Sequence, residues 1–158
     1  MKRIILLLTV GFAFAACSQK SPDGAQLLKI LNDENLSLVV SNGDSISRHA
    51  GQRVDDLMRL VTTEPERLRG AVVADMKVGY AAASLIACGG VREVHTNYVT
   101  RAAKKILEQA GVKLVAANEG DIIFNRDSTG RCPMDSTLNG ITTAEQGFEI
   151  LKTKFYAE

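Results

Sequence analysis

The chain has 158 residues, 46% of them hydrophobic and 23% charged, which fits one globular domain and excludes disordered, collagen-like and coiled-coil architectures. Its formal net charge is +1, from 19 basic and 18 acidic residues, and it has two histidines and no tryptophan. Nucleic-acid binders need a clustered positive face, so we expect no nucleic-acid partner.

The N-terminus is predicted to be a secretory leader. Met1-Lys2-Arg3 is cationic, and an apolar run from Ile4 to Ala16 follows it. The run is about 13 residues long, which is too short to cross a bilayer that needs roughly 20. Its end, Ala13-Phe14-Ala15-Ala16-Cys17, resembles a bacterial lipoprotein cleavage site, where the cysteine is acylated and becomes the N-terminus. An ordinary secretory signal with a free Cys17 is the alternative.

This leader predicts export across the inner membrane and a lipid anchor in the bacterial cell envelope. The expected divisions are a lipoprotein signal peptide (1–16), a polar tether that carries lipidated Cys17 (17–24), and one domain (25–158). Two more cysteines, Cys88 and Cys132, lie in the domain. An oxidising compartment permits them to pair, but their spacing in the chain does not decide whether they do.

In the first half of the domain, helical spacing of apolar residues predicts helices over 25–32 and 54–61. Leu36–Val40 and Ser45–His49 flank Ser41-Asn42-Gly43-Asp44, which predicts a β-hairpin, because Asn-Gly tolerates the positive φ of a tight turn. Thr63-Glu64-Pro65-Glu66 has capping-box spacing, so a short helix should start there and stop at Gly70.

In the second half, strands and helices alternate. Strands are expected over 71–74, 91–96 and 113–117, and helices over 77–87 and 100–110, with a last amphipathic helix from Thr142. The segment 118–140 is long, polar and almost without periodicity, which is typical of a functional or disordered connection. A hairpin followed by this alternation predicts a three-layer α/β/α sandwich with a mixed sheet.

Two segments carry a family resemblance. Gly70–Ala83 (GAVVADMKVGYAAA) and Asn125–Asp135 (NRDSTGRCPMD) together resemble the bacterial domain of unknown function 1893 family, over roughly 35–155. By fold, that family is similar to the cytidine deaminase-like superfamily, and it has no assigned activity. The resemblance therefore implies a deaminase-like fold.

The residues do not support zinc-dependent deamination. Such enzymes take a His or Cys ligand from one helix and two Cys from a Pro-Cys-x-x-Cys turn, with a nearby glutamate as proton shuttle. Here His95 is followed by Thr96-Asn97, and Cys132-Pro133-Met134-Asp135 offers one thiol where two are needed. We expect neither a metal nor another cofactor.

Asp75 and Lys77 are the first pair of candidate ligand-binding residues. They are expected where a buried strand ends and a helix begins, the place where α/β proteins often bind ligands. Asp75 has the alternative role of helix N-cap. A lysine in the first turn opposes the helix dipole, so Lys77 should have a charge partner, whether Asp75, Asp135 or an anionic ligand. A solvated Lys77 on the surface is the alternative.

The second group of candidates lies in the polar loop. A cradle for a carboxylate or phosphate is predicted from Asn125, Arg126, Thr129 and Gly130, with turn formation as the alternative. Cys132 is a candidate nucleophile with His95 as its base, or else an unreactive thiol.

The leading hypothesis is an envelope lipoprotein that binds a small polar or anionic ligand between Asp75-Lys77 and the loop from Asn125 to Asp135. One alternative is a metal-free enzyme in which Lys77, Asp75 or Asp135, and Cys132 perform acid–base or covalent steps. The other is a structural or interaction lipoprotein. Ligand identity, catalysis, inner or outer membrane and oligomeric state are left open by the sequence.

Overall fold

The computed structural model describes residues 22–51, 53–125 and 127–156. Its strands are β1 (Leu38–Asn42), β2 (Ser45–His49), β3 (Val72–Val78), β4 (Glu93–Thr100), β5 (Lys113–Ala116) and β6 (Glu119–Gly120). Its helices are α1 (Gly24–Asp33), α2 (Arg53–Thr63), α3 (Pro65–Leu68), α4 (Tyr80–Cys88), α5 (Arg101–Gln109), α6 (Pro133–Thr137) and α7 (Ala144–Tyr156). The leader and Cys17 lie outside the described residues. Within those residues, no helix is long and apolar enough to span a membrane.

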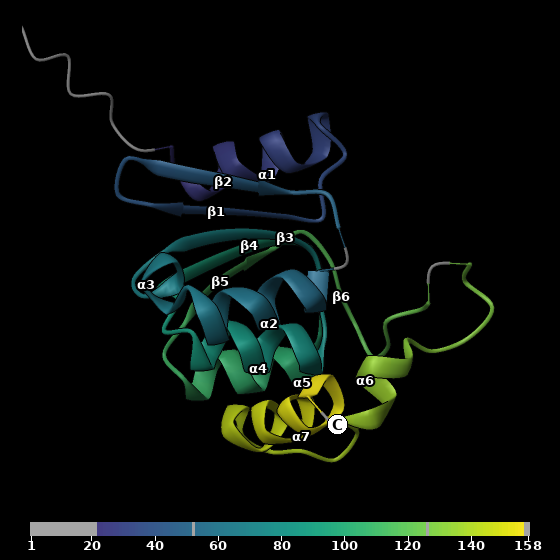
Figure 1. Ribbon diagram of the computed structural model, residues 1–158. Coiled ribbons are helices and arrows are strands. Elements are labelled where there is room, and N and C mark those ends of the chain that lie inside the picture. The colour runs from purple at the N-terminus through teal and green to yellow at the C-terminus, as the bar shows by residue number, and fades with distance from the viewer. Residues whose placement is uncertain (1–21, 52, 126, 157–158) are drawn as a thin grey trace, which may run out of the picture.

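The strands form one mixed sheet in the order β2-β1-β3-β4-β5, and β6 pairs with β4 beyond the end of β5. β1 is antiparallel to β2 and β3, whereas β3, β4 and β5 run parallel. Helix α1 covers one face, and α2, α4 and α5 cover the other, with α7 packed outside α4 (Figure 1). The predicted three-layer α/β/α sandwich with a mixed sheet is confirmed.

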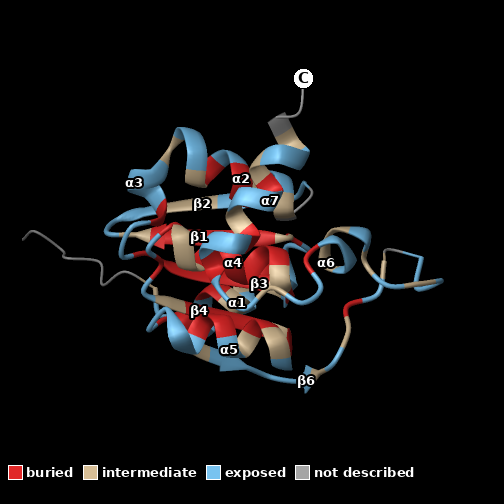
Figure 2. Ribbon diagram, turned by 90° about the horizontal axis from the view of Figure 1, so that it is seen from below, coloured by how far each residue is buried: buried red, intermediate tan, exposed pale blue. Residues whose placement is uncertain are grey.

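Alternation along β3 divides the core into two clusters. Val73 points into a large cluster shared with α2, α4, α5 and α7. Val72 and Ala74 point to the opposite face, where they pack with Leu27 and Leu31 of α1. Buried residues accordingly concentrate in the central strands and in the helices that face them (Figure 2). Since strands buried on both faces read as continuous apolar runs, the sequence Ala71–Ala74 did indicate this central strand.

The predicted hairpin is confirmed, with its turn one residue later than expected. Asn42 pairs with Ser45, so Gly43 and Asp44 are the two turn residues. Gly43 is the first of these two residues and has φ +58°. A two-residue hairpin turn of type II′ has glycine at this first position.

The predicted boundary between β3 and the helix after it was wrong. The strand extends to Val78, and the helix begins at Tyr80 rather than Lys77. The reason is that β3 keeps its parallel pairing with β4 as far as Val78, opposite Val99. Asp75 and Lys77 therefore lie inside a strand, and Asp75 is not a helix cap.

Two other local predictions need correction. Helix α3 has Glu64 as its N-cap residue, with no side-chain capping bond, so Thr63 does not form the expected capping box. The connection 118–140 contains the short strand β6 and helix α6.

Candidate functional site

The two segments that carry the family resemblance meet at the first turn of α4. Gly79 is the N-cap residue of α4 and has no side chain with which to cap it. Asp135 of α6 performs this role, because its Oδ1 accepts a hydrogen bond from the Tyr80 amide at 2.5 Å. A Cβ on Gly79 would overlap this carboxylate and would come within 2.8 Å of Ile123 Cδ1. Glycine at this position lets the two segments approach.

Asp135 is partly withdrawn from water. Burial raises the pKa of its carboxyl, while the amides of Tyr80 and Ala81 and the charge of Arg131 oppose that rise. A carboxyl in such a setting protonates more readily than one on the surface. It accepts hydrogen bonds when ionised and can donate one when protonated.

A cavity of about 60 Å³ adjoins this carboxyl. Side chains that can form hydrogen bonds line it together with Asp135: Tyr80, Asp121, Arg131, Ser136 and Asn139. Ile122 also lines the cavity, and its carbonyl accepts a hydrogen bond from the Tyr98 hydroxyl at 2.9 Å. The volume is sufficient for a few water molecules or a small polar group.

Asp75 is fully buried in the middle of β3. Its Oδ1 accepts a hydrogen bond from the Lys77 amide at 3.0 Å. Thr96, its partner across the sheet, makes a similar local contact, since its hydroxyl oxygen accepts from the Tyr98 amide at 3.2 Å. Both side chains bond the backbone two residues further on, in neighbouring strands. Each contact therefore stabilises the backbone of its own strand at this level.

Lys77 does not join Asp135. Its side chain is exposed, and it makes no ion pair or hydrogen bond with any residue in the described ranges. It is also not among the residues that line the cavity. Its observed setting is that of the solvated surface lysine.

The polar loop forms a self-contained turn that projects beyond α6 (Figure 1). Asn125 Nδ2 donates to the Thr129 hydroxyl at 3.1 Å, and Asn125 Oδ1 accepts from the Gly130 amide at 3.1 Å. These polar groups thus bond one another in a turn. Arg126 lies outside the described residues.

Comparison with known proteins fits the two-segment resemblance. Residues 26–155 match the family model described as a domain of unknown function (DUF1893). The chain belongs to the DUF1893 family. The crystal structure of a DUF1893 family protein from Thermotoga maritima is similar, with a TM-score of 0.72 and 24% sequence identity over 83% of this chain and 88% of that chain. That likeness shows the fold. No curated protein matches the chain.

Cys88, Cys132 and His95 of this DUF1893 domain each contact different neighbouring residues. Cys88 and Cys132 are free thiols. Burial raises the pKa of Cys88 to about 11, and Glu145 and Glu149 add to the effect. His95 lies beneath Gly24 of α1 and bonds Glu93 Oε1 through Nε2 at 2.7 Å.

Cys132 is the N-cap residue of α6, and its amide donates to the Ile123 carbonyl at 2.8 Å. No described group of three or more His, Cys, Asp or Glu residues could hold a metal ion. Of the polar residues that line this cavity of the DUF1893 domain, the sequence analysis selected Asp135 and missed the others, of which Arg131 is the basic one. Its position directly before Cys132, inside a matched segment, was the available signal.

Proposed function

We propose that this DUF1893 protein is an envelope lipoprotein whose domain binds a small polar or anionic ligand in the cavity between α4 and α6. The observation that carries the proposal is the half-buried Asp135 carboxyl on the first amide of α4, in a cavity that Arg131 also lines. A guanidinium can bind a carboxylate or phosphate through two parallel hydrogen bonds. Burial raises the pKa of Asp135, so this carboxyl takes up a proton more readily than a surface carboxyl and can then donate to an anion.

The cavity supports this proposal better than it supports the metal-free enzyme with Lys77, Asp75 and Cys132. Lys77 is exposed, and the Asp75 carboxylate bonds its own strand. Neither residue lines the cavity, and Cys132 does not line it either. An acid–base mechanism needs its groups within hydrogen-bond reach of one substrate atom. The binding role needs only Arg131, Asp135 and their polar neighbours.

Native mass spectrometry of the mature protein, purified from the organism that encodes it, tests the binding role. We expect a small molecule to be retained by the wild type and by Lys77→Ala, and to be lost from Arg131→Ala. The reason is that Arg131 lines the cavity and Lys77 does not. Circular dichroism checks that both variants fold. Absence of any retained molecule from the wild type, or its loss in Lys77→Ala alone, would contradict the proposal.

The anchor is supported by how soon the domain follows the lipidation motif. Asp23, six residues after Cys17 in the sequence, is the N-cap of α1, and its Oδ1 accepts from the Gln26 amide at 2.8 Å. In cells fed labelled palmitate, we expect the wild type to incorporate label and Cys17→Ser to lose it. The matched control is Cys88→Ser, which should be labelled like the wild type. Equal labelling of Cys17→Ser and wild type would remove the anchor.

A further inference from the structure

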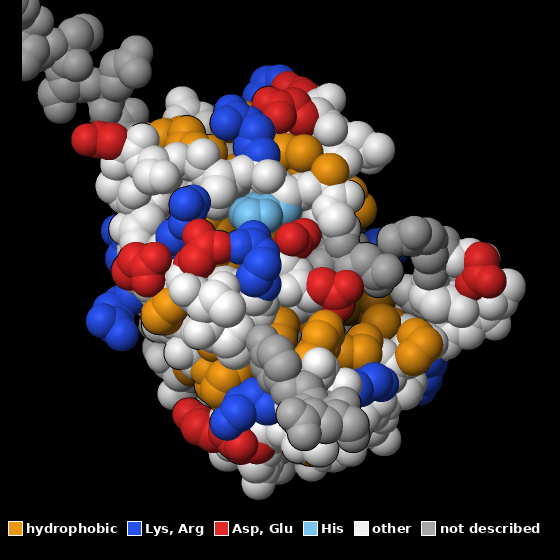
Figure 3. All heavy atoms as spheres, viewed as in Figure 1, with side chains coloured by type: hydrophobic (Ala, Val, Ile, Leu, Met, Phe, Trp, Pro, Cys, Tyr) orange, Lys and Arg blue, Asp and Glu red, His pale blue; other side chains and the backbone are white. Residues whose placement is uncertain are grey.

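A polar cluster lies on the edge strand β2, where its side chains face residues of α2 and α3. Figure 3 shows a histidine on this side of the molecule among basic and acidic side chains. Ser47 and His49 are two residues apart on β2, so their side chains share a face. The Ser47 Oγ lies 3.1 Å from His49 Nε2, which is hydrogen-bond distance.

Asp56 of α2 faces the other ring nitrogen of His49. Its Oδ1 lies 3.6 Å from Nδ1, and the side chains of His49 and Asp56 are only 11% and 20% exposed. With the proton on Nδ1 beside this carboxylate, Nε2 is free to accept the hydroxyl hydrogen of Ser47. Ser47, His49 and Asp56 thus have the arrangement of a nucleophile, its base and a carboxylate that orients the base. Contacts of this kind are often long in unliganded proteins.

The surroundings favour the neutral form of the imidazole. Burial lowers the pKa of His49, and Arg59 and Arg67 lower it further. Asp56 and Glu64 oppose this shift. A histidine must be neutral to accept a proton, so these surroundings suit a general base at neutral pH.

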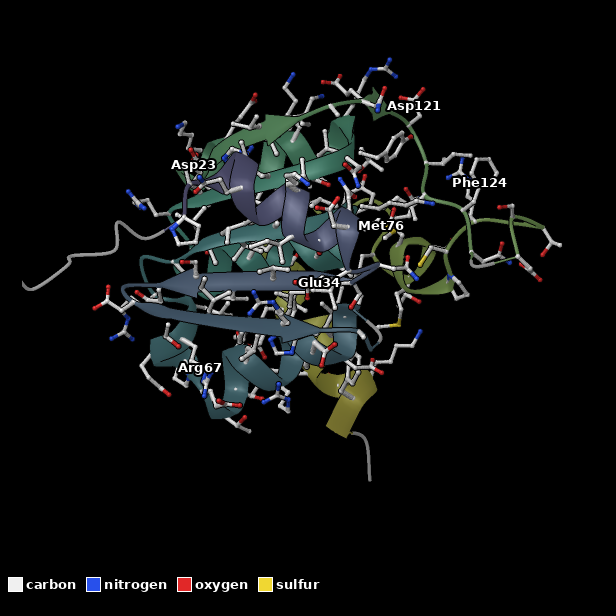
Figure 4. The ribbon with its side chains drawn as sticks, turned by 90° about the horizontal axis from the view of Figure 1, so that it is seen from above. Asp23, Glu34, Arg67, Met76, Asp121 and Phe124 are labelled. Atoms are coloured by element: carbon white, nitrogen blue, oxygen red, sulfur yellow. The ribbon has the colours of Figure 1, made fainter. Side chains whose placement is uncertain are left out.

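A cavity of about 160 Å³ opens beside Ser47. Ser45 and Arg67 line it too, and one wall is Asn42, whose amide donates to the carbonyls of Glu66, Arg67 and Arg69. Those bonds fix the wall. Arg67 brings a cation to the lining of this cavity, with its Nε paired with Glu64 Oε2 at 2.5 Å, and a cation near the reacting group stabilises negative charge that develops on an attacked carbonyl oxygen. In Figure 4, Arg67 lies at the opposite end of the molecule from Asp121 and Phe124, which places this cavity far from the α4–α6 junction.

We propose that Ser47, His49 and Asp56 form a hydrolytic centre for esters with a small acyl group. Ser47 Oγ forms a bond to the acyl carbon, and the bond from that carbon to the leaving alcohol breaks. His49 takes the hydroxyl proton and delivers it to the alcohol. Water then attacks the acyl group, His49 takes its proton, and Ser47 recovers its hydrogen as the carboxylic acid leaves. Asp56 orients the imidazole throughout.

The test uses a small alkyl fluorophosphonate, which transfers its phosphorus to an activated serine and releases fluoride. The full chain is incubated with it at neutral pH, and the adduct is mapped by peptide mass spectrometry. We expect one adduct on Ser47, absent from Ser47→Ala. The matched control Arg48→Ala, changed on the same strand at a side chain that pairs with Glu34 and does not line the cavity, should label like the wild type. His49→Gln should slow labelling by on the order of 100-fold.

The same variants are then assayed for hydrolysis of an aryl acetate, and their loss of rate should follow their loss of labelling. A wild type that forms no adduct on Ser47 would overturn the proposal. So would an adduct that forms equally fast in a folded His49→Gln variant, because the serine would then react without its base.

Discussion

Replacement of Leu27 by alanine should lower the free energy of unfolding by about 2–5 kcal/mol, the usual cost of removing a large apolar side chain from a packed core. Leu27 is 0% exposed and belongs to the cluster that α1 forms with β1 and β3. Among the described elements only α1 covers this face of the sheet, so no second helix fills the space that the Leu27 side chain leaves (Figure 1). Urea unfolding followed by circular dichroism measures the change.

Lys29→Ala is the matched control on the same helix. The Lys29 side chain is 73% exposed and pairs with Asp33 one turn along, a surface contact that contributes about 1 kcal/mol or less. If Leu27→Ala cost no more than this control, α1 would not be part of the cooperative core.

The fold was predictable because its main signals are local. Periodicity located α1, α2 and α5 to within about two residues, as expected for strongly amphipathic segments. The continuous apolar run at Ala71–Ala74 located β3 because the strand is covered on both faces.

The end of β3 was mispredicted for a physical reason. Polar residues usually end a buried strand, and Asp75 and Lys77 fit that pattern in sequence. In the structure, Asp75 Oδ1 accepts from the Lys77 amide inside the strand, and β3 keeps its pairing with β4 as far as Val78. The pairing with β4 joins residues about 20 positions apart in the chain, so no local pattern could have revealed where β3 ends.

The sites were only partly predictable, because they depend on contacts between distant parts of the chain. Asp135 was selected from its motif, but its contact with the Tyr80 amide spans 55 residues. Ser47 and His49 are two positions apart on one strand, so the sequence alone indicates that their side chains share a face. Their partner Asp56 comes from the next helix, and its orientation toward the imidazole follows from packing alone.

Gly79→Ala should lower the free energy of unfolding by about 1–3 kcal/mol, the typical cost of an overpacked site. The backbone is not the obstacle, since φ is −107° and alanine adopts that conformation readily. The cost comes from the added methyl group, which would overlap Asp135 Oδ1 and press on Ile123. The carboxylate would have to move off the α4 amide, so any ligand of the cavity should bind more weakly as well.

A double-mutant cycle with Asp135→Ala separates this cause from a general loss of packing. Asp135→Ala alone should cost about 1 kcal/mol through the lost cap. With the carboxylate gone, the methyl group at position 79 has space, so the two changes together should cost less than their sum by about 0.5–3 kcal/mol. Gly130→Ala is the control, because the nearest atom to its added methyl is Asn125 Nδ2 at 3.9 Å. Strict additivity of Gly79→Ala and Asp135→Ala in urea unfolding would show that the two family segments are not energetically joined at this contact.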